Sequence, residues 1–419
     1  MSKENDGNGV LSQNETPTPV PPVPTPVPSV QPETPGALAE ALRQASAQTQ
    51  SIVIRGAGTK MDWGRPAGRI DAFLETRGLN KILAHQHGDL TATIEAGASL
   101  ADVNAALAQH GQWLPLDPAF ADRATIGGLL ATNDSGPLRH RYGTPRDLVI
   151  GVQLATADGT LAKAGGRVVK NVAGYDLGKL VTGSFGSLAA ITSATFKLSP
   201  LPKASKTLIV AVDNDARLGE IVRQMMASQL EPLAFELRSA QASRYEITIR
   251  VASLPAVVDA QIAQARTLLG PLAPSIDVID GDAEQTLWRD HNARMWSAAG
   301  ALDAPVDNVA IVRAAWLPAS IATALSELKA MDAPIDLVGR AAVGAGLLRI
   351  DGDTGTQARV ITRLRQSTSF GNIVVLRGSE ALKAAVDVWG PMGDRERLLA
   401  SLKHALDPQR TLNAGRGPL

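Results

Sequence analysis

Closely spaced glycines follow an apolar strand near the start of the chain. The segment Arg55-Gly-Ala-Gly-Thr-Lys60 comes directly after a predicted strand at 51–54, and its glycines leave backbone N–H groups free to point at an anion. A phosphate group suits such a turn, although a purely structural turn is the alternative. The segment is too short for a Walker loop and lacks the third glycine of a strict G-x-G-x-x-G.

A second group of glycines lies between residues 115 and 147. Ala124-Thr-Ile-Gly-Gly128 and Thr132-Asn-Asp-Ser-Gly136 combine glycines with hydroxyl and amide donors, which suit a pyrophosphate and a polar heterocycle. Two more glycine segments follow, KNVAGYD at 170–176 and GSFGSLAAI at 183–191. Each one alone could be a tight structural turn, but the four together predict one large ligand.

Composition excludes several classes of function. The 41 Lys plus Arg residues balance 41 Asp plus Glu, so the chain lacks the basic excess of a nucleic-acid binder or an anionic-membrane binder. The absence of cysteine excludes disulfides, thiolate zinc sites and cysteine-ligated iron–sulfur clusters. Any one-electron relay is therefore expected in another chain.

The elements that must position these glycines fall into four parts. Residues 1–35 are rich in proline and are expected to be a disordered tail that adds no strand or helix to the core. Short strands alternate with glycine turns over 36–205, and the order of predicted strands and helices changes over 206–378. A C-terminal segment, 379–419, contains a predicted helix at 394–406.

The region 206–378 contains a repeat. Strands and helices follow the order βαββαβ from 207 to 280, and the same order recurs from 309 to 376. Two such units predict one antiparallel sheet with helices on one face. Between them lies a predicted helix that carries Trp288, His291 and Trp296.

Taken together, the motifs resemble a known flavoprotein family. The order RGAGTK, DP-x6-TIGG, ATN-x-SGP, YG-x-x-RD, KNVAGYDL-x-KL and GS-x-G-x-L-x-x-I is similar to that of the vanillyl-alcohol-oxidase (PCMH-type) flavoproteins, in particular the FAD-binding E subunits of glycolate oxidase, also called glycolate dehydrogenase. The closing LDPQRTLNAGR at 406–416 is similar to the family's LDP-x-x-x-LNPGR, with Ala414 in place of proline. This resemblance implies an α+β fold, in which a two-part PCMH-type FAD-binding domain (36–205 and 379–419) carries an inserted cap of two ferredoxin-like repeats (206–378).

The resemblance also implies which residues bind FAD. One set would hold the pyrophosphate, a second would follow the pyrophosphate, ribityl chain and flavin ring, and Ile191 would lie near the adenine. A third set would line the flavin pocket. The three sets are Gly56, Ala57, Gly58, Thr59 and Lys60; Thr125, Ile126, Gly127, Gly128, Asn133, Ser135 and Gly136; and Arg139, Tyr142, Arg146, Lys170 and Asn171.

The function implied is that of the FAD-binding subunit of a multisubunit glycolate dehydrogenase, which oxidises glycolate to glyoxylate. Its partners would be a paralogous FAD subunit and an iron–sulfur subunit that receives the electrons. Alternatives are a self-sufficient dehydrogenase of another 2-hydroxy acid such as D-lactate, and a subunit that only relays electrons or supports assembly. The chain has no signal-peptide pattern and no apolar run of about 18 residues. We therefore expect a cytoplasmic protein that meets the inner membrane only through its complex.

Departures from the family pattern bear on the cofactor and the substrate. The segment RGAGTKMDWG contains no histidine or cysteine to tether a flavin, so the resemblance implies non-covalent FAD. The cap lacks the histidine-rich H-x-G-D-G-N-x-H motif of catalytic relatives, and His291 is expected to mark a packed helix face. Arg313 and Arg340 lie in apolar strands, where each needs a carboxylate from the protein or from a bound 2-hydroxy acid. His140 is either a solvated loop residue or a functional contact.

Overall fold

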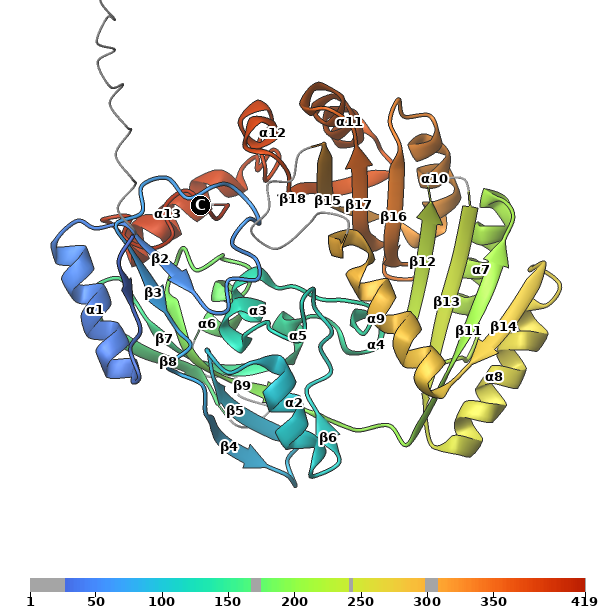
Figure 1. The fold of residues 1–419 in the computed structure, drawn as a ribbon, viewed down its shortest axis with the longest axis horizontal. Coiled ribbons are helices and arrows are strands. Elements are labelled where there is room, and N and C mark those ends of the chain that lie inside the picture. Colours follow the sequence, from blue (N-terminus) through green and yellow to red (C-terminus); the bar gives the residue numbers. More distant parts are fainter. Residues whose placement is uncertain (1–26, 167–174, 241–243, 298–307, 419) are drawn as a thin grey trace, which may run out of the picture.

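The protein consists of two halves that lie side by side (Figure 1). The structure is a computed structural model that describes residues 27–166, 175–240, 244–297 and 308–418. One half contains the N-terminal sheets and receives the C-terminal helix, and the other is built on a single large sheet. Within the described residues, no helix has the length and apolar character needed to cross a membrane.

A small parallel sheet and one helix begin the first half. The strand order is β1-β3-β2, with bounds Ser29–Val30, Ala72–Glu75 and Ile52–Arg55. Helix α1 (Pro35–Ala47) begins at Thr34, whose hydroxyl accepts a hydrogen bond from Ala37 N at 3.1 Å, and Pro35 suits the first helical position. Its buried side chains Leu38 and Leu42 belong to a core cluster that also contains Ile52 and Leu74 of this sheet.

The expected tail at 1–35 is wrong for its last residues. Strand β1 pairs in parallel with Phe73 and Leu74 of β3, and Phe73 N donates to Pro28 O at 2.8 Å. Pro28 is tolerated beside β1 because β1 is an edge strand, where a missing backbone N–H does not break the hydrogen bonding of the sheet. Residues 1–26 lie outside the described part of the chain.

A five-stranded antiparallel sheet completes the first half, in the order β4-β5-β9-β7-β8. The bounds are Ile82–Gln86, Thr91–Glu95, Ala190–Lys197, Val149–Ala155 and Leu161–Gly165. A short pair, β6 (Gln112–Trp113) and β10 (Ser199–Pro200), lies beside it. The helices are α2 (Leu100–Ala108), α3 (Ile126–Thr132), α4 (Arg139–Tyr142), α5 (Pro145–Leu148) and α6 (Leu177–Val181).

The second half, the cap, is built on an eight-stranded antiparallel sheet in the order β14-β11-β13-β12-β16-β17-β15-β18. Its first unit comprises β11 (Ala204–Val212), α7 (Asp215–Ala227), β12 (Ala234–Ala240), β13 (Arg244–Ser253), α8 (Pro255–Leu269) and β14 (Ser275–Ile279). After α9 (Gly281–Ser297), the second comprises β15 (Val309–Trp316), η1 (Pro318–Ser320), α10 (Ile321–Lys329), β16 (Ile335–Arg340), β17 (Ala345–Asp351), α11 (Thr354–Gln366) and β18 (Phe370–Arg377).

This topology confirms the predicted pair of ferredoxin-like units. In each unit the fourth strand pairs with the first, the first with the third and the third with the second. The two second strands, β12 and β16, pair antiparallel and fuse the units into one sheet. Helix α9 lies on the side of the sheet that faces the first half (Figure 1).

The end of the chain returns to the first half through α12 (Glu380–Ala385) and α13 (Arg395–Leu406). The buried ammonium of Lys403 donates to Ser187 O at 2.7 Å, to the Asp407 carboxylate at 2.6 Å and to Leu412 O at 3.0 Å. Beyond α13, Leu412 forms a parallel bridge with Ile52 of β2. The last residues are thereby placed beside the glycine turn that follows β2.

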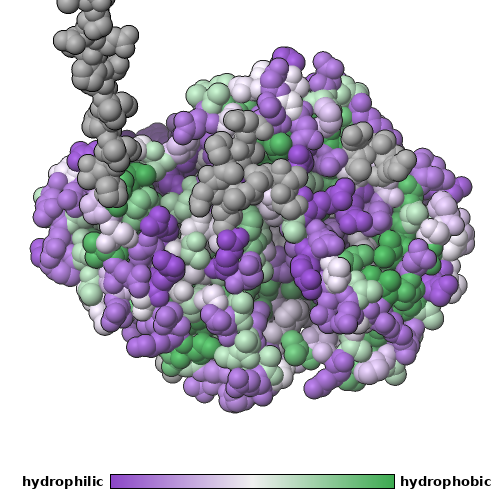
Figure 2. All heavy atoms as spheres, viewed as in Figure 1, coloured by the Kyte–Doolittle hydropathy of each residue, from purple (hydrophilic) through white to green (hydrophobic). Residues whose placement is uncertain are grey.

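Apolar side chains gather inside the molecule in three clusters. The cap cluster continues into the first half through Trp63, Ala119 and Phe185. On the face seen in Figure 2, hydrophilic residues predominate and apolar residues form small separate patches. The cap cluster therefore crosses the boundary between the two halves, while the other two clusters lie within the first half.

Candidate functional site

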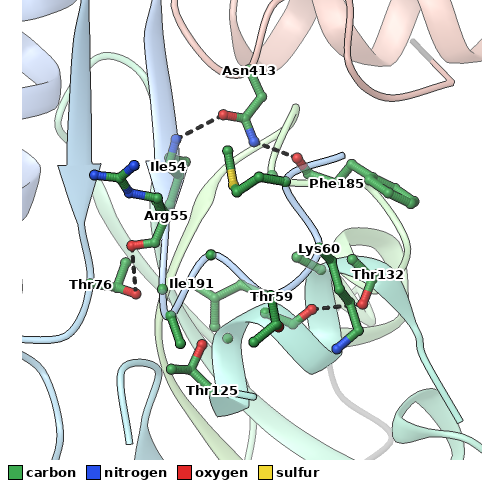
Figure 3. Close-up of a pocket in the computed structure, with 18 of the residues that line it drawn as sticks. Ile54, Arg55, Thr59, Lys60, Thr76, Thr125, Thr132, Phe185, Ile191 and Asn413 are labelled. Atoms are coloured by element: carbon green, nitrogen blue, oxygen red, sulfur yellow. Dashed lines mark hydrogen bonds between the residues drawn. The ribbon is translucent and has the colours of Figure 1, made fainter. Parts of the chain in front are cut away.

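The glycine turn after β2 forms one wall of a cavity with an empty volume of about 690 Å³. Figure 3 shows the turn curving around this space, with Thr125 below the turn and Thr132 to its right. This size lies within the usual range of sites for small molecules and cofactors. The sequence-predicted residues that line it are Gly56, Ala57, Gly58, Thr59, Lys60, Thr125, Gly127, Gly128 and Ile191.

The backbone of the turn is available to a ligand. No described residue accepts a hydrogen bond from the N–H groups of residues 56 to 60. Gly58 has a φ of +74°, in the left-handed region that favours glycine. A Cβ on Gly56 would lie 2.2 Å from Thr125 Oγ1, so only glycine allows the turn to approach α3 this closely. Free N–H groups in a glycine-rich turn fit a pyrophosphate.

Lys60 lines the cavity, but its ammonium group is directed elsewhere. Nζ donates to Ala119 O at 3.2 Å and lies 3.3 Å from the Asp134 carboxylate. Burial lowers the pKa of Lys60, and the nearby Asp134 partly opposes this shift. The side chain thus ties the glycine turn to the segment that follows α3.

The C-terminal segment supplies cavity residues that the sequence reasoning did not assign. Asn413 Oδ1 accepts a hydrogen bond from Ile54 N at 2.8 Å, and its amide nitrogen donates to Phe185 O at 2.5 Å (Figure 3). Arg416 also lines the cavity and donates to Met61 O at 2.6 Å. Both residues belong to the closing LNAGR motif, which is the sequence signal that could have identified them as cavity residues.

A second, wider cavity lies between the two halves. Its empty volume is about 1320 Å³, and it shares the lining residues Thr132 and Phe185 with the glycine cavity, so the two cavities are neighbours. Asn133 contributes from the first half and Arg313 from strand β15 of the cap. The Nε atom of Arg313 is buried and has no hydrogen-bond partner among the described residues.

Ser135 and Gly136 lie apart from the glycine cavity, in a small space between the halves. A Cβ on Gly136 would lie 2.0 Å from Asp117 O, and Gly136 N donates to the Asp117 carboxylate at 3.1 Å. Burial raises the pKa of Asp117 to about 8. Gly136 therefore permits close packing against Asp117.

Arg340 borders the same small space and has a protein partner. Its Nε lies 3.4 Å from the carboxylate of Glu236, which also lies 3.0 Å from His291 Nε2. Glu236 and His291 are buried, and the His291 ring packs against Trp288 with centroids 5.3 Å apart. Of the two alternatives for Arg340, the structure favours the protein carboxylate, and His291 belongs to a packed helix face.

The remaining predicted residues are not brought to the glycine cavity. The Ile126 side chain is buried in the core, and Arg146 is exposed. Tyr142 packs edge-on against Trp113, with ring centroids 5.9 Å apart. His140 is half-buried with its ring edge-on to Phe235 of the cap, and burial lowers its pKa. Lys170 and Asn171 lie outside the described residues.

Three arginines converge where the halves meet. Burial lowers the pKa of Arg139, and the positive charges of Arg340 and Arg313 lower it further. Arg340 faces Glu236, and the negative charges of Asp147 and Asp134 act on Arg139 and Arg313, respectively. Of the three arginines, Arg313 lines the wider cavity, where its guanidinium can meet the carboxylate of a ligand.

Comparison with known proteins identifies the family. The FAD binding domain family matches residues 27–165. A D-2-hydroxyglutarate dehydrogenase of Xanthomonas citri pv. viticola is 30% identical over 417 aligned positions, which cover 91% of this chain and 88% of that protein. The glycolate oxidase subunits GlcE of Escherichia coli and GlcD of Bacillus subtilis are 36% and 35% identical over 47% and 44% of this chain. Those alignments span 55% and 39% of the two subunits, about half of their length.

Among solved structures, an alkyldihydroxyacetonephosphate synthase shares the fold. Its TM-score is 0.65 at 17% sequence identity, over 92% of this chain and 75% of that one. The fold and the glycine cavity are those of an FAD-binding flavoprotein. Within that class, the chain belongs to the FAD-dependent oxidoreductases of the 2-hydroxy acid family, and FAD is its cofactor.

Proposed function

We propose that this chain is the FAD-binding subunit of a multisubunit glycolate dehydrogenase, which oxidises glycolate to glyoxylate. The observation that carries the proposal is the wider cavity beside the glycine cavity: the two share Thr132 and Phe185 as lining residues, and the wider one is lined by Arg313, whose Nε has no hydrogen-bond partner among the described residues. The 36% sequence identity to a subunit named for glycolate oxidase, over 47% of this chain, supports the choice of substrate.

We assign the FAD contacts of this chain to the residues that line the glycine cavity. The N–H groups of residues 56 to 60 would hold the pyrophosphate, with Gly127, Gly128 and Ile191 along the opposite wall. No histidine or cysteine lines this cavity among the described residues, which supports non-covalent binding. The C-terminal segment would complete the site through Asn413 and Arg416.

The substrate would lie in the wider cavity. The guanidinium of Arg313 can hold the carboxylate of a 2-hydroxy acid by two parallel hydrogen bonds, and Arg139 adds positive charge nearby. When bound, FAD supplies the two-electron acceptor for the oxidation of the hydroxyl-bearing carbon. The protein's contribution is to fix the carboxylate and to cover the reacting carbon with the cap.

The proposed organisation assigns 36–205 and 379–419 to the FAD-binding domain and 206–378 to the cap. The limits of the eight-stranded sheet, Ala204 and Arg377, support these boundaries. Because the sequence has no cysteine, the electrons would leave through an iron–sulfur subunit, with a paralogous FAD subunit as a further partner. Association with the inner membrane would be peripheral and would pass through this complex.

A second candidate is a self-sufficient dehydrogenase of another 2-hydroxy acid, such as D-lactate or D-2-hydroxyglutarate. The similarity to a D-2-hydroxyglutarate dehydrogenase favours it, because that alignment covers 91% of this chain. A third candidate is a subunit that only relays electrons. It differs from the other two because its own flavin does not react with substrate.

Anaerobic reduction of the flavin tests these candidates. The purified chain with bound FAD is mixed with glycolate, D-lactate or D-2-hydroxyglutarate, first alone and then with the proposed partner chains, and flavin absorbance is recorded. We expect glycolate to bleach the flavin fastest. Bleaching only by another acid supports the second candidate, and bleaching that requires the partner chains supports a relay. A chain purified without any flavin contradicts all three.

A further inference from the structure

Three of the six histidines of the chain gather at one place on the surface. His85 lies in strand β4, His87 directly follows that strand, and His110 lies in the turn after α2. Ring centroids are 4.1 Å apart for His85 and His87, and 3.9 Å apart for His87 and His110. One nitrogen from each ring lies within 4.8 Å of the others.

The backbone fixes these positions from two sides. Strand β4 is the edge of the five-stranded sheet and pairs with β5, where His85 lies opposite Ala92. The turn that carries His110 is closed by hydrogen bonds from His110 N to Leu107 O and from Gly111 N to Ala108 O, at 3.0 and 2.9 Å. The rings of His87 and His110 are exposed on the surface, whereas His85 is half-buried.

A buried glutamine orients the cluster. Gln112 Nε2 donates to His87 O at 2.9 Å, which directs its Oε1 to His85 Nε2 at 2.8 Å. His85 Nε2 must therefore carry the proton, and its Nδ1 keeps the lone pair. A ligand histidine in metal sites commonly donates its other ring N–H to an oxygen in this way.

We propose that His85, His87 and His110 form a surface site for a divalent transition-metal ion such as Zn²⁺, with a fourth position open to solvent. Imidazole nitrogen suits Zn²⁺, Cu²⁺ and Ni²⁺, whereas Ca²⁺ and Mg²⁺ prefer the oxygen ligands that this group lacks. The three rings need to converge to Zn–N distances of about 2.0–2.1 Å. None of the three histidines lines either cavity of the FAD site, so the metal site is separate from the proposed oxidation.

Titration of the flavin-loaded protein with ZnCl₂ in a calorimeter tests the site. We expect one saturable ion per chain in the wild type, and at least about tenfold weaker binding in His87→Gln and in His110→Gln. Gln112→Ala should weaken binding about 10–100-fold through loss of the orienting contact. The matched control is His404→Gln, a single exposed histidine of α13, which should bind Zn²⁺ like the wild type.

Flavin absorbance serves as the folding control, and both ligand variants are surface substitutions that should retain it. Electron paramagnetic resonance of the Cu²⁺-loaded wild type should show hyperfine coupling to nitrogen ligands that changes in His87→Gln. Absence of saturable Zn²⁺ binding in the wild type overturns the proposal. Equal affinity in the wild type, His87→Gln and His110→Gln, with flavin retained, also overturns it, because the ion then binds elsewhere.

Discussion

Two glycines of one turn serve different physical needs. At Gly56 the limit is distance, because a Cβ there would lie 2.2 Å from Thr125 Oγ1. At Gly58 the limit is conformation, because φ is +74° while a Cβ would meet its nearest atoms only at 3.7 Å. A substitution at Gly58 therefore tests the shape of the turn without forcing a clash with α3.

Gly58→Val should abolish FAD binding. A β-branched residue resists positive φ, at a cost of about 1–3 kcal/mol, and its side chain would change the path of N–H groups that face the cavity. Flavin content after purification, read from absorbance, measures the effect. The matched control is Gly68→Val, where a Cβ has nothing within 4 Å. A full complement of flavin in Gly58→Val would show that this turn does not hold the pyrophosphate.

Arg313→Gln should impair substrate oxidation while FAD stays bound. Loss of a charged hydrogen bond to a carboxylate costs about 1.5–3 kcal/mol, so kcat/KM should fall roughly 10–150-fold. The rate of anaerobic flavin bleaching against acid concentration measures it. Arg289→Gln, an exposed position on α9, provides the control. If Arg313→Gln keeps the wild-type kcat/KM, the carboxylate is bound elsewhere.

For single residues, the sequence motifs located the glycine cavity because the residues that form each of its walls are close together in the chain. They did not assign Asn413, whose bond to Ile54 joins residues 359 positions apart. Nor did they show that the Lys60 ammonium turns to Asp134, or that Gly136 packs against Asp117. Such details depend on which segments meet in the folded chain.

Among the elements, the repeat in the cap was predictable because each strand is short, apolar and bounded by turns. The predicted strand at 309–316 and the predicted helix at 394–406 agree with β15 and, to within one residue, with α13. Strand β1 was missed because a proline-rich segment has no strand pattern of its own. Its extended conformation results from pairing with the edge of β3.

Comparison of two truncations tests the contribution of β1. Removal of residues 1–31, which keeps the Thr34 cap of α1, should lower the melting temperature by a few degrees relative to removal of residues 1–26, because only the longer deletion uncovers the edge of β3. The backbone hydrogen bonds lost are each worth about 0.5–1.5 kcal/mol. Thermal unfolding followed by circular dichroism measures the difference. Identical melting temperatures would show that β1 adds no stability to the parallel sheet.

Across the whole molecule, the cap is joined to the FAD-binding half by aromatic and ionic contacts beside the two cavities. Trp296 of α9 stacks on Trp63 with ring centroids 5.1 Å apart, and the ring of Phe120 lies 5.7 Å from that of Trp296. Arg141 pairs with Glu231 of the cap at 2.9 Å. Because the wide cavity lies between the halves, whatever holds the cap in place also sets the geometry at Arg313.

A double-mutant cycle of Trp63→Ala and Trp296→Ala measures how strongly the stack couples the halves. Each single change removes a buried indole and should cost about 3–5 kcal/mol of unfolding free energy. Because the rings contact each other, the double mutant should be less destabilised than the sum of the two, by about 0.5–1.5 kcal/mol. Denaturant unfolding gives these energies, and KM for the 2-hydroxy acid should rise in Trp296→Ala as the cap loosens. Additive energies with an unchanged KM would mean that the ion pairs and the chain connections alone position the cap over the flavin.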